Sequence, residues 1–236
     1  NAQEFGGNPP SIKWKQINTK AARVIFPAGL EKQAQQVANI SIDLSTTTLT
    51  SIGNKIRKID IVLQNQTTTS NGYVALGPYR SEFHIVPHPN SFSLGSLPWV
   101  KSLTLHEYRH VQQYNNFRKG FSSAFYFLFG EEGLALANAL TVPDWFFEGD
   151  AVYQETIASK QGRGRLPYFF NGYRSLWSAG KDYSYMKLRN GSLRDFVPSH
   201  YSLGYMFVAY GREKYGRDFW TKVTGDAASW IEQARA

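Results

Sequence analysis

The chain has 236 residues, 42% hydrophobic and 19% charged, which is typical of a globular protein that can bury a sizeable core. Basic residues exceed acidic ones by 8, but they are scattered along the chain, so we expect no nucleic-acid partner. The absence of cysteine excludes disulfides, thiol nucleophiles and cysteine-ligated metals.

No apolar run in the sequence is long enough to cross a membrane. The segment 121–142 comes closest, but Glu131, Glu132 and Asn138 interrupt it. No signal peptide is visible, and we expect an exported bacterial protein, periplasmic or associated with the cell envelope, whose signal or anchor has been removed. The oligomeric state is left open.

The first half of the chain predicts a sheet with one helix. Residues 1–13 contain Gly-Gly and Pro-Pro pairs and are expected to be loose or extended. Strands are predicted where apolar residues alternate or run continuously, and a helix where they recur at helical spacing. In chain order these elements are a strand at 21–27, a helix at 28–44, a strand at 56–65 and two short strands within 71–87, broken at Gly77-Pro78.

A capped helix is expected to begin the second half. Ser96 is predicted to cap it, Pro98 to stand in its first turn and Gly120 to end it. Later helices are predicted at about 143–159, at 201–215 and after Asp226.

Strands early and helices late define an α+β protein. We expect a single domain over residues 1–236. Its N-terminal subdomain, about 14–120, holds a twisted mixed sheet and the helix that follows Ser96. Its C-terminal subdomain, about 121–236, is mainly helical.

The helix after Ser96 contains an HExxH motif, His106-Glu107-Tyr108-Arg109-His110. Residues four apart on a helix share one face, so both imidazoles can reach one Zn²⁺. Glu107 lies on an adjacent part of that face, where it can act as general base on a water that zinc activates. The alternative is a helix with two incidental histidines.

A catalytic zinc needs a third protein ligand and an open position. The sequence after His110 has no third histidine at metzincin spacing. Glu148 is the best candidate, because its expected helix is apolar and an unpaired carboxylate there is costly unless a metal offsets the cost. A Glu148 paired with a nearby arginine is the alternative.

HExxH followed by a helix that carries W-x-x-E-G-x-A, Trp145 to Ala151, resembles the gluzincins, and most closely the bacterial peptidase MA-like domain. The resemblance covers most of the chain and implies a zincin-like fold. It implies His106, His110 and Glu148 as ligands and Glu107 as base. The 37 residues between His110 and Glu148 exceed the aminopeptidase spacing, and the aromatic segment 121–142 fills the difference.

The resemblance also suggests an oxyanion donor and groups that orient the ligands. Tyr201-Ser202-Leu203-Gly204 is similar to the start of the aminopeptidase helix that carries such a tyrosine, so Tyr201 is the expected donor. His200 and Tyr205 are its possible replacements. Asp150 and Glu155 share the expected ligand helix, and either could orient a ligating imidazole.

Two other groups of residues are assigned no chemistry. His84 and His88 are four apart, but Pro87 and Pro89 make that segment extended, which separates the histidines by roughly 13 Å, too far for one zinc. The stretch 160–165, Lys-Gln-Gly-Arg-Gly-Arg, is interpreted as a solvated loop.

The sequence therefore predicts a zinc-dependent hydrolase of gluzincin type that cleaves a peptide or protein substrate laid along the strand near 72–86. Two alternatives remain. One is a cell-envelope binding module that keeps zinc for structure, and the other is a zinc hydrolase of a non-peptide amide or ester. The substrate, the cleavage preference and the choice between endopeptidase and exopeptidase are left open.

Overall fold

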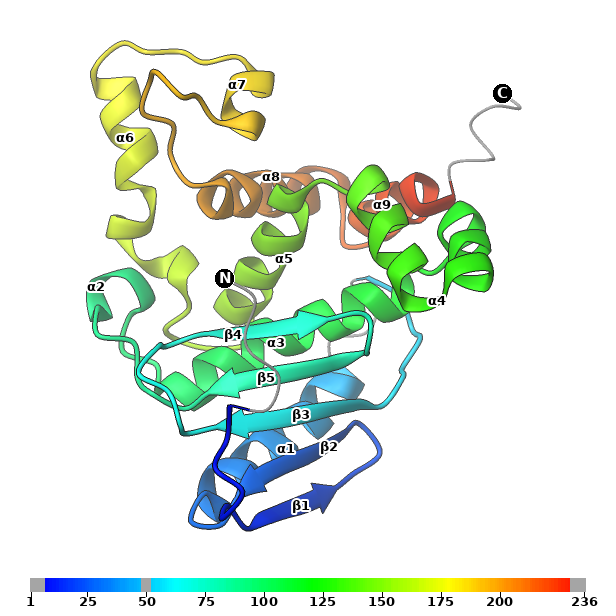
Figure 1. Ribbon diagram of the computed structural model, residues 1–236. Helices are drawn as coiled ribbons and strands as arrows, with labels where there is room; N and C mark the ends of the chain where they lie inside the picture. The colour runs from blue at the N-terminus through cyan, green and yellow to red at the C-terminus, as the bar shows by residue number, and fades with distance from the viewer. Residues whose placement is uncertain (1–6, 48–51, 230–236) are drawn as a thin grey trace.

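A five-stranded mixed sheet forms one side of the molecule in the computed structural model, which describes residues 7–47 and 52–229 (Figure 1). The strand order is β1-β2-β3-β5-β4. Strands β2, β3 and β5 run parallel, and the outer strands β1 and β4 are antiparallel to their neighbours. The strands are β1 Trp14–Asn18, β2 Ala22–Pro27, β3 Ile59–Gln64, β4 Gly72–Ala75 and β5 Arg80–His84.

Two helices, α1 (Glu31–Thr47) and α3 (Trp99–Asn116), pack against this sheet and form its core. Side chains alternate between buried and half-buried along β3, as a strand covered on one face requires. The buried cluster includes Val24, Ile61 and Phe83 from the sheet and further side chains from both helices. The strands predicted at 21–27 and 56–65 and the helix predicted at 28–44 are confirmed.

The two short strands predicted within 71–87 are β4 and β5, joined by a turn with a cis Gly77-Pro78 bond. Strand β1 was not predicted, because most of its side chains are exposed and show no apolar alternation. It follows the stretch 1–13, of which residues 1–6 lie outside the described part of the chain.

Helices joined by loops make up most of the rest of the described chain, and the α+β class is confirmed. They pack around a second core whose buried side chains include Ile52, Phe117, Phe146 and Leu203. Since Ile52 and Phe117 precede residue 120, this core draws on both expected subdomains. The helices are α2 Ser91–Leu94, α4 Gly120–Thr141, α5 Asp144–Ile157, α6 Asn171–Ser178, α7 Tyr185–Asn190, α8 His200–Tyr215 and α9 Phe219–Ser229.

Several helix boundaries differ from the prediction. Ser96 does not cap α3: Pro98 occupies the N-cap position, and the Ser96 hydroxyl bonds instead to Gln161 Oε1 at 2.8 Å. Helix α3 ends at Asn116, so Gly120 begins α4 rather than ending α3. Helix α9 begins at Phe219, ahead of Asp226.

Helix α4 fills the aromatic segment between the two predicted ligand helices. Gly130 adopts φ 65° inside it, a left-handed conformation that kinks the helix into two pieces. Among residues 7–47 and 52–229, no helix combines the length and apolar character that crossing a bilayer requires.

Helices α5 and α8 cross at two glycines. A β-carbon on Gly204 would lie 1.7 Å from the carbonyl oxygen of Trp145, and one on Gly149 would lie 2.1 Å from the carbonyl carbon of Gly204. Only glycine permits so close an approach. The crossing brings the first turn of α8, which carries Tyr201, against the part of α5 that carries Glu148.

Candidate metal centre

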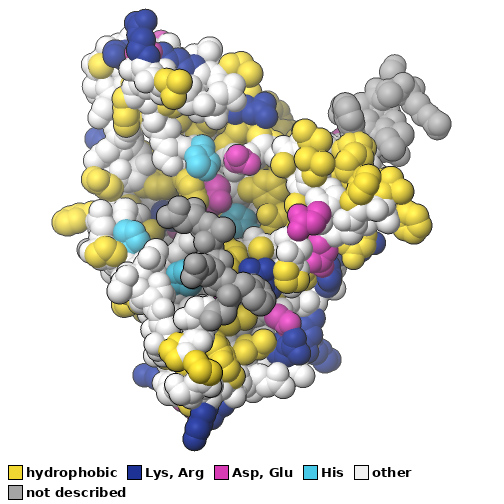
Figure 2. All heavy atoms as spheres, in the orientation of Figure 1, with side chains coloured by type: hydrophobic (Ala, Val, Ile, Leu, Met, Phe, Trp, Pro, Cys, Tyr) yellow, Lys and Arg dark blue, Asp and Glu magenta, His cyan; other side chains and the backbone are white. Residues whose placement is uncertain are grey.

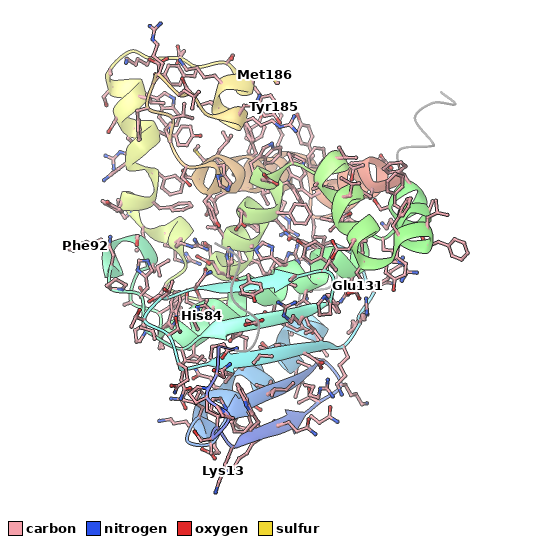
Figure 3. The ribbon with its side chains drawn as sticks, in the orientation of Figure 1. Lys13, His84, Phe92, Glu131, Tyr185 and Met186 are labelled. Carbon is pink, nitrogen blue, oxygen red and sulfur yellow. The ribbon has the colours of Figure 1, made fainter. Side chains whose placement is uncertain are left out.

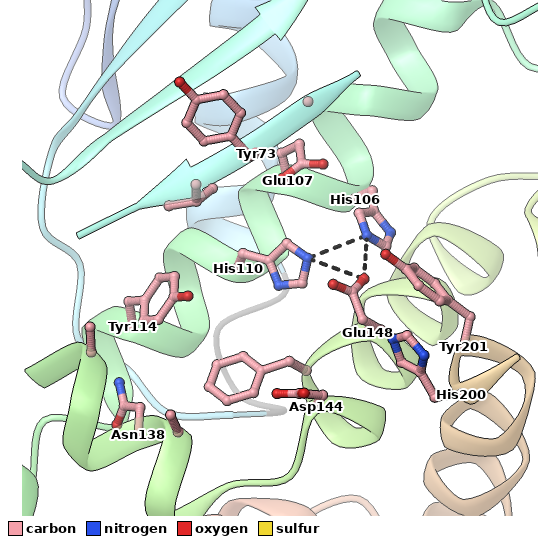
Figure 4. A pocket seen from close by; sticks show the side chains of 15 residues that line it. Tyr73, His106, Glu107, His110, Tyr114, Asn138, Asp144, Glu148, His200 and Tyr201 are labelled. Carbon is pink, nitrogen blue, oxygen red and sulfur yellow. Dashed lines mark hydrogen bonds and ion pairs between the residues drawn. The ribbon is translucent and has the colours of Figure 1, made fainter. Parts of the chain in front are cut away.

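His106, His110 and Glu148 converge at one point between α3 and α5 (Figure 4). His106 Nε2 lies 3.1 Å from Glu148 Oε2 and 3.3 Å from His110 Nε2. His110 Nε2 lies 3.6 Å from Glu148 Oε2. Among the described residues, this is the one group of histidine and acidic side chains close enough to hold a metal ion.

These separations suit a tetrahedral zinc. Ligand atoms about 2.0–2.1 Å from a tetrahedral ion lie about 3.3–3.4 Å from one another. The three measured separations, 3.1, 3.3 and 3.6 Å, bracket that value. The donor set of two imidazole nitrogens and one carboxylate oxygen is also one that zinc accepts, so the residues fit the ion.

The ring of His110 is oriented by Gln113, one turn further along α3. Gln113 Nε2 donates to the carbonyl of Phe147 and to Asp150 Oδ2, at 2.9 and 3.0 Å. Its Oε1 is therefore free to accept from His110 Nδ1, 2.8 Å away. With the proton held on Nδ1, the Nε2 lone pair points to the metal position.

Asp150 was considered as a residue that orients an imidazole, and it contacts Gln113 rather than a histidine. It forms a buried two-point ion pair with Arg109, with Nε–Oδ2 and Nη2–Oδ1 separations of 2.6 and 3.0 Å. Arg109 is the second x of HExxH. An ion pair between Arg109 and Asp150 thus joins α3, which carries HExxH, to α5, which carries Glu148.

Glu155 lies beside the ring of His106. Its Oε2 is 3.3 Å from His106 Nδ1, and Arg163 holds the same carboxylate at 2.8 and 2.9 Å. Burial raises the pKa of Glu155, but the charge of Arg163 and hydrogen bonds with His106 and Arg163 outweigh burial and lower the pKa to about 2. An ionised Glu155 can accept a hydrogen bond from His106 when the ring proton is on Nδ1.

Arg163 corrects one interpretation of the sequence. The stretch 160–165 was expected to be a solvated loop, yet the Arg163 side chain is only 14% exposed. Its Nη2 lies 2.7 Å from His106 Nδ1. A guanidinium can only donate, so this contact is a hydrogen bond only when His106 Nδ1 carries no proton. When Nδ1 is protonated, Arg163 hydrogen-bonds to Glu155 and not to His106.

Glu107 is buried beside the three converging residues and lines the same cavity. A β-carbon on Gly72 of β4 would lie 3.2 Å from its Oε1, so strand and carboxylate are close neighbours. Burial raises the pKa of Glu107, opposed by the charges of His106 and His110. A raised pKa favours proton exchange near neutral pH.

Tyr201 stacks on the His106 ring, with centroids 6.2 Å apart and planes at 20°. Its hydroxyl points toward His106 and Glu148 in Figure 4. Burial first, and then the Glu148 carboxylate, raises the pKa of that hydroxyl. His200 also lines the cavity, whereas Tyr205 is not among the lining residues and packs on Gly164.

The charges of the three converging residues favour a cation at their centre. Burial lowers the pKa of His110, but the Glu148 carboxylate more than offsets this and raises it to about 9. Burial raises the pKa of Glu148, and the two histidines outweigh that and lower it. A negative charge held between two imidazoles is suited to a divalent ion.

A cavity of about 390 Å³ opens beside His106, His110 and Glu148. Strand β4 lines one side of it with Gly72, Tyr73 and Val74. Helix α4 lines another with Ala135, Asn138 and Ala139. In Figure 2 acidic and histidine side chains gather near the centre of the visible face, with the apolar side chains of α4 to their right.

His84 and His88 lie apart from this centre. His84 is buried on β5, with Nδ1 3.2 Å from the carbonyl of Thr69. It is the last residue of β5, at the end of the sheet (Figure 3). His88 Nδ1 accepts from the backbone N–H of Asn90.

Gln113, Arg109 and Arg163 are neighbours of the converging residues that the sequence analysis did not assign to the site. The spacing of Gln113 to His110, one helical turn, could have indicated it, whereas Arg163 reaches Glu155 through a loop that carries no spacing rule. Compared with models of protein families, with curated proteins and with solved structures, the chain gives no match.

Proposed function

We propose that the chain is a zinc-dependent peptidase of gluzincin type, with a zincin-like fold closest to the bacterial peptidase MA-like domain. The observation that carries the proposal is the convergence of His106, His110 and Glu148 at separations of 3.1–3.6 Å beside an open cavity. Two helices supply these ligands, α3 through HExxH and α5 through W-x-x-E-G-x-A.

Zinc bound by these residues would lower the pKa of a water molecule and polarise the substrate carbonyl. Glu107 takes the proton from the attacking water and passes it to the leaving amine. The Tyr201 hydroxyl donates a hydrogen bond to the oxygen that becomes negative in the transition state. Gln113 and Glu155 keep the two imidazoles oriented throughout.

The position of β4 supports a peptide as substrate. It is the outer strand of the sheet, and within the described residues it pairs with β5 alone. Its open edge offers backbone donors and acceptors to an extended chain, and three of its residues line the cavity. Gly72 of β4 lies beside Glu107, so a peptide added along this edge would lie close to the proposed base.

The cavity favours a catalytic zinc over the alternative, a binding module in which zinc is purely structural. Structural zinc sites are closed by four protein ligands, whereas catalytic sites have three and an open position. The described residues supply three, and the space beside them is about 390 Å³. A cavity of that size accepts several substrate atoms.

Hydrolysis of a mixed peptide library by zinc-loaded protein tests the proposal. Mass spectrometry should find cleavage products with the wild type. Glu107→Gln should retain zinc and lose activity by about 10²–10⁴-fold, since general base catalysis is removed. Glu213→Gln, an exposed change on α8, is the control. If Glu107→Gln cleaves peptides at the wild-type rate, Glu107 is not the general base.

A further inference from the structure

Helix α4 carries three large apolar side chains that face solvent. They stand consecutively, just before the bend at Gly130 that divides the helix into two pieces. Phe127, Leu128 and Phe129, which form the apolar tip, are 87%, 66% and 63% exposed. Single exposed apolar side chains are ordinary, whereas adjacent ones mark a surface that contacts a partner or a membrane.

The two pieces of α4 pack closely enough to hold the apolar tip in place. A β-carbon on Gly133, in the second piece, would lie 2.3 Å from the carbonyl oxygen of Phe125, in the first. Figure 1 shows α4 at the right edge of the molecule, farther out than the sheet, and Figure 2 shows apolar side chains gathered at that edge. The tip therefore belongs to a projecting element rather than to the wall of a groove.

The acidic side chains of α4 are turned toward the sheet. Glu131 Oε2 accepts from the backbone N–H groups of Gly77 and Tyr79, in the turn between β4 and β5. Glu132 faces the same turn, because its Oε1 would lie 2.0 Å from a β-carbon on Gly77. The apolar tip itself carries no charge.

Basic side chains lie beside the apolar tip. The guanidinium of Arg118 stacks on the ring of Tyr126, one residue before the tip, 3.4 Å from its centroid. Lys55 Nζ donates to the carbonyl of Arg118 at 3.1 Å, and Lys119 is the N-cap of the helix. Apolar side chains with cations beside them suit the surface of an anionic bilayer, where the former enter the acyl region and the latter bind phosphates.

We propose that the apolar tip of α4 docks the protein on an anionic lipid bilayer. Phe127, Leu128 and Phe129 enter the interface between headgroups and acyl chains, where aromatic side chains are favoured. Arg118 and Lys55 lie at the level of the headgroups. The docking is interfacial, since no helix within 7–47 and 52–229 suits a bilayer crossing. The inference goes beyond the proposed function, because docking requires neither zinc nor turnover.

A second copy of the chain fits the apolar tip less well than a bilayer does. In a symmetric dimer the same surface meets itself, so the cations beside one tip would face those beside the other. At their exposed fractions the three side chains offer roughly 400 Å² of apolar surface, about half of the ~800 Å² that each partner buries in a standard interface. A bilayer supplies the opposite charge and needs no matching shape.

Docking through α4 also bears on the substrate. The second piece of the helix lines the cavity with Ala135, Asn138 and Ala139. A protein held by the apolar tip therefore presents its cavity beside the bilayer, where polypeptides attached to the membrane are within reach. This consequence rests on the proposed function, whereas the docking does not.

Vesicle flotation of zinc-loaded and metal-free protein tests the docking. Wild-type protein should bind phosphatidylglycerol vesicles at least about tenfold more tightly than phosphatidylcholine vesicles. Phe127→Ser with Leu128→Ser should weaken binding to phosphatidylglycerol by at least about tenfold at unchanged Tm, because two exposed apolar side chains no longer leave water. The matched control is Phe92→Ser with Leu193→Ser, two exposed residues outside α4, which should bind as the wild type.

A fluorescent label identifies the part of the surface that meets the lipid. The chain has no cysteine, so Phe127→Cys provides a unique attachment point for a dye that brightens in an apolar environment. Phe92→Cys is the control, since Phe92 lies at the opposite edge of the molecule from α4 (Figure 3). The dye at position 127 should brighten on phosphatidylglycerol vesicles, and the dye at position 92 should not.

A tip variant that binds vesicles as tightly as the wild type, or equal brightening at both positions, would overturn the inference. Binding would then follow from net charge alone. A wild-type dimer that the tip variant converts to a monomer, with no binding to vesicles, would also overturn it and identify a second copy as the occupant. Failure of the proposed function has a different signature: no zinc and no peptide cleavage, with vesicle binding intact.

Discussion

At the scale of single residues, each imidazole in the proposed site contacts a different side chain through its Nδ1 atom. Gln113 accepts from His110 and is itself held by Asp150, and Glu155 lies against His106 and is held by Arg163. Each series of contacts ends in an arginine, the buried Arg109 and the partly buried Arg163. The rings therefore have little freedom to rotate, which lowers the entropic cost of binding a metal.

Gln113→Ala should weaken zinc binding by about 10–100-fold, because the proton on His110 Nδ1 loses its acceptor. Competition with a chelator of known affinity measures the change, and Gln35→Ala on the exposed face of α1 is the control. Unchanged zinc affinity in the Gln113 variant would mean that the contact at 2.8 Å does not orient the ligand.

Tyr201→Phe should keep zinc and the stacked ring and lower turnover by about 10²–10³-fold, since one oxyanion donor is lost. The effect should fall on kcat more than on KM, because the donor acts on charge that develops in the transition state. Steady-state kinetics on a cleaved peptide makes the measurement. A loss of less than about threefold would pass the role to His200, which also lines the cavity.

The sequence predicted which residues converge, but not the side chains that surround them. HExxH has a fixed helical geometry, so its two histidines and Glu107 were predictable from spacing. Glu148 required a motif 38 residues away and a resemblance. Gln113, Arg109 and Arg163 were not assigned, because their roles depend on which helix and loop pack across α3, and spacing within one helix does not contain that information.

At the scale of elements, the crossing of α5 and α8 decides whether Tyr201 reaches Glu148. Gly149 and Gly204 permit the backbones to touch, which explains the glycine in each of the two motifs. The sequence shows both glycines but does not show that they meet at one helix crossing. It also missed α4, because a helix that is apolar on most sides has no clear period to detect.

Gly204→Ala should destabilise the protein by at least about 1–3 kcal/mol, since the new methyl group would lie 1.7 Å from the Trp145 carbonyl oxygen. The matched control is Gly225→Ala in α9, where only the end of the flexible Lys119 side chain is near, at 3.1 Å. That change should be neutral or stabilising by up to about 1 kcal/mol. Urea unfolding measures both. Equal effects would argue against the close crossing.

At the scale of the whole molecule, the three converging residues, His106, His110 and Glu148, lie where two cores meet. One core lies between the sheet and helices α1 and α3, and the other among α5, α8 and α9. Ligands from α3 and α5 would tie the cores together, and the Arg109–Asp150 ion pair already does so without a metal. The α+β class was predictable because strands come early in the sequence and helices late. The sequence did not predict that Ile52 and Phe117, from the first half of the chain, belong to the second core.

Metal analysis of purified protein tests the central claim most directly. After zinc loading and removal of free ion, the account predicts about one zinc per chain for the wild type. Glu148→Ala should lose most of it while the fold, monitored by circular dichroism, is retained. Glu132→Ala, an exposed change on α4, should behave as the wild type. Folded wild-type protein without zinc, or a Glu148 variant that binds zinc as tightly as the wild type, would contradict the account.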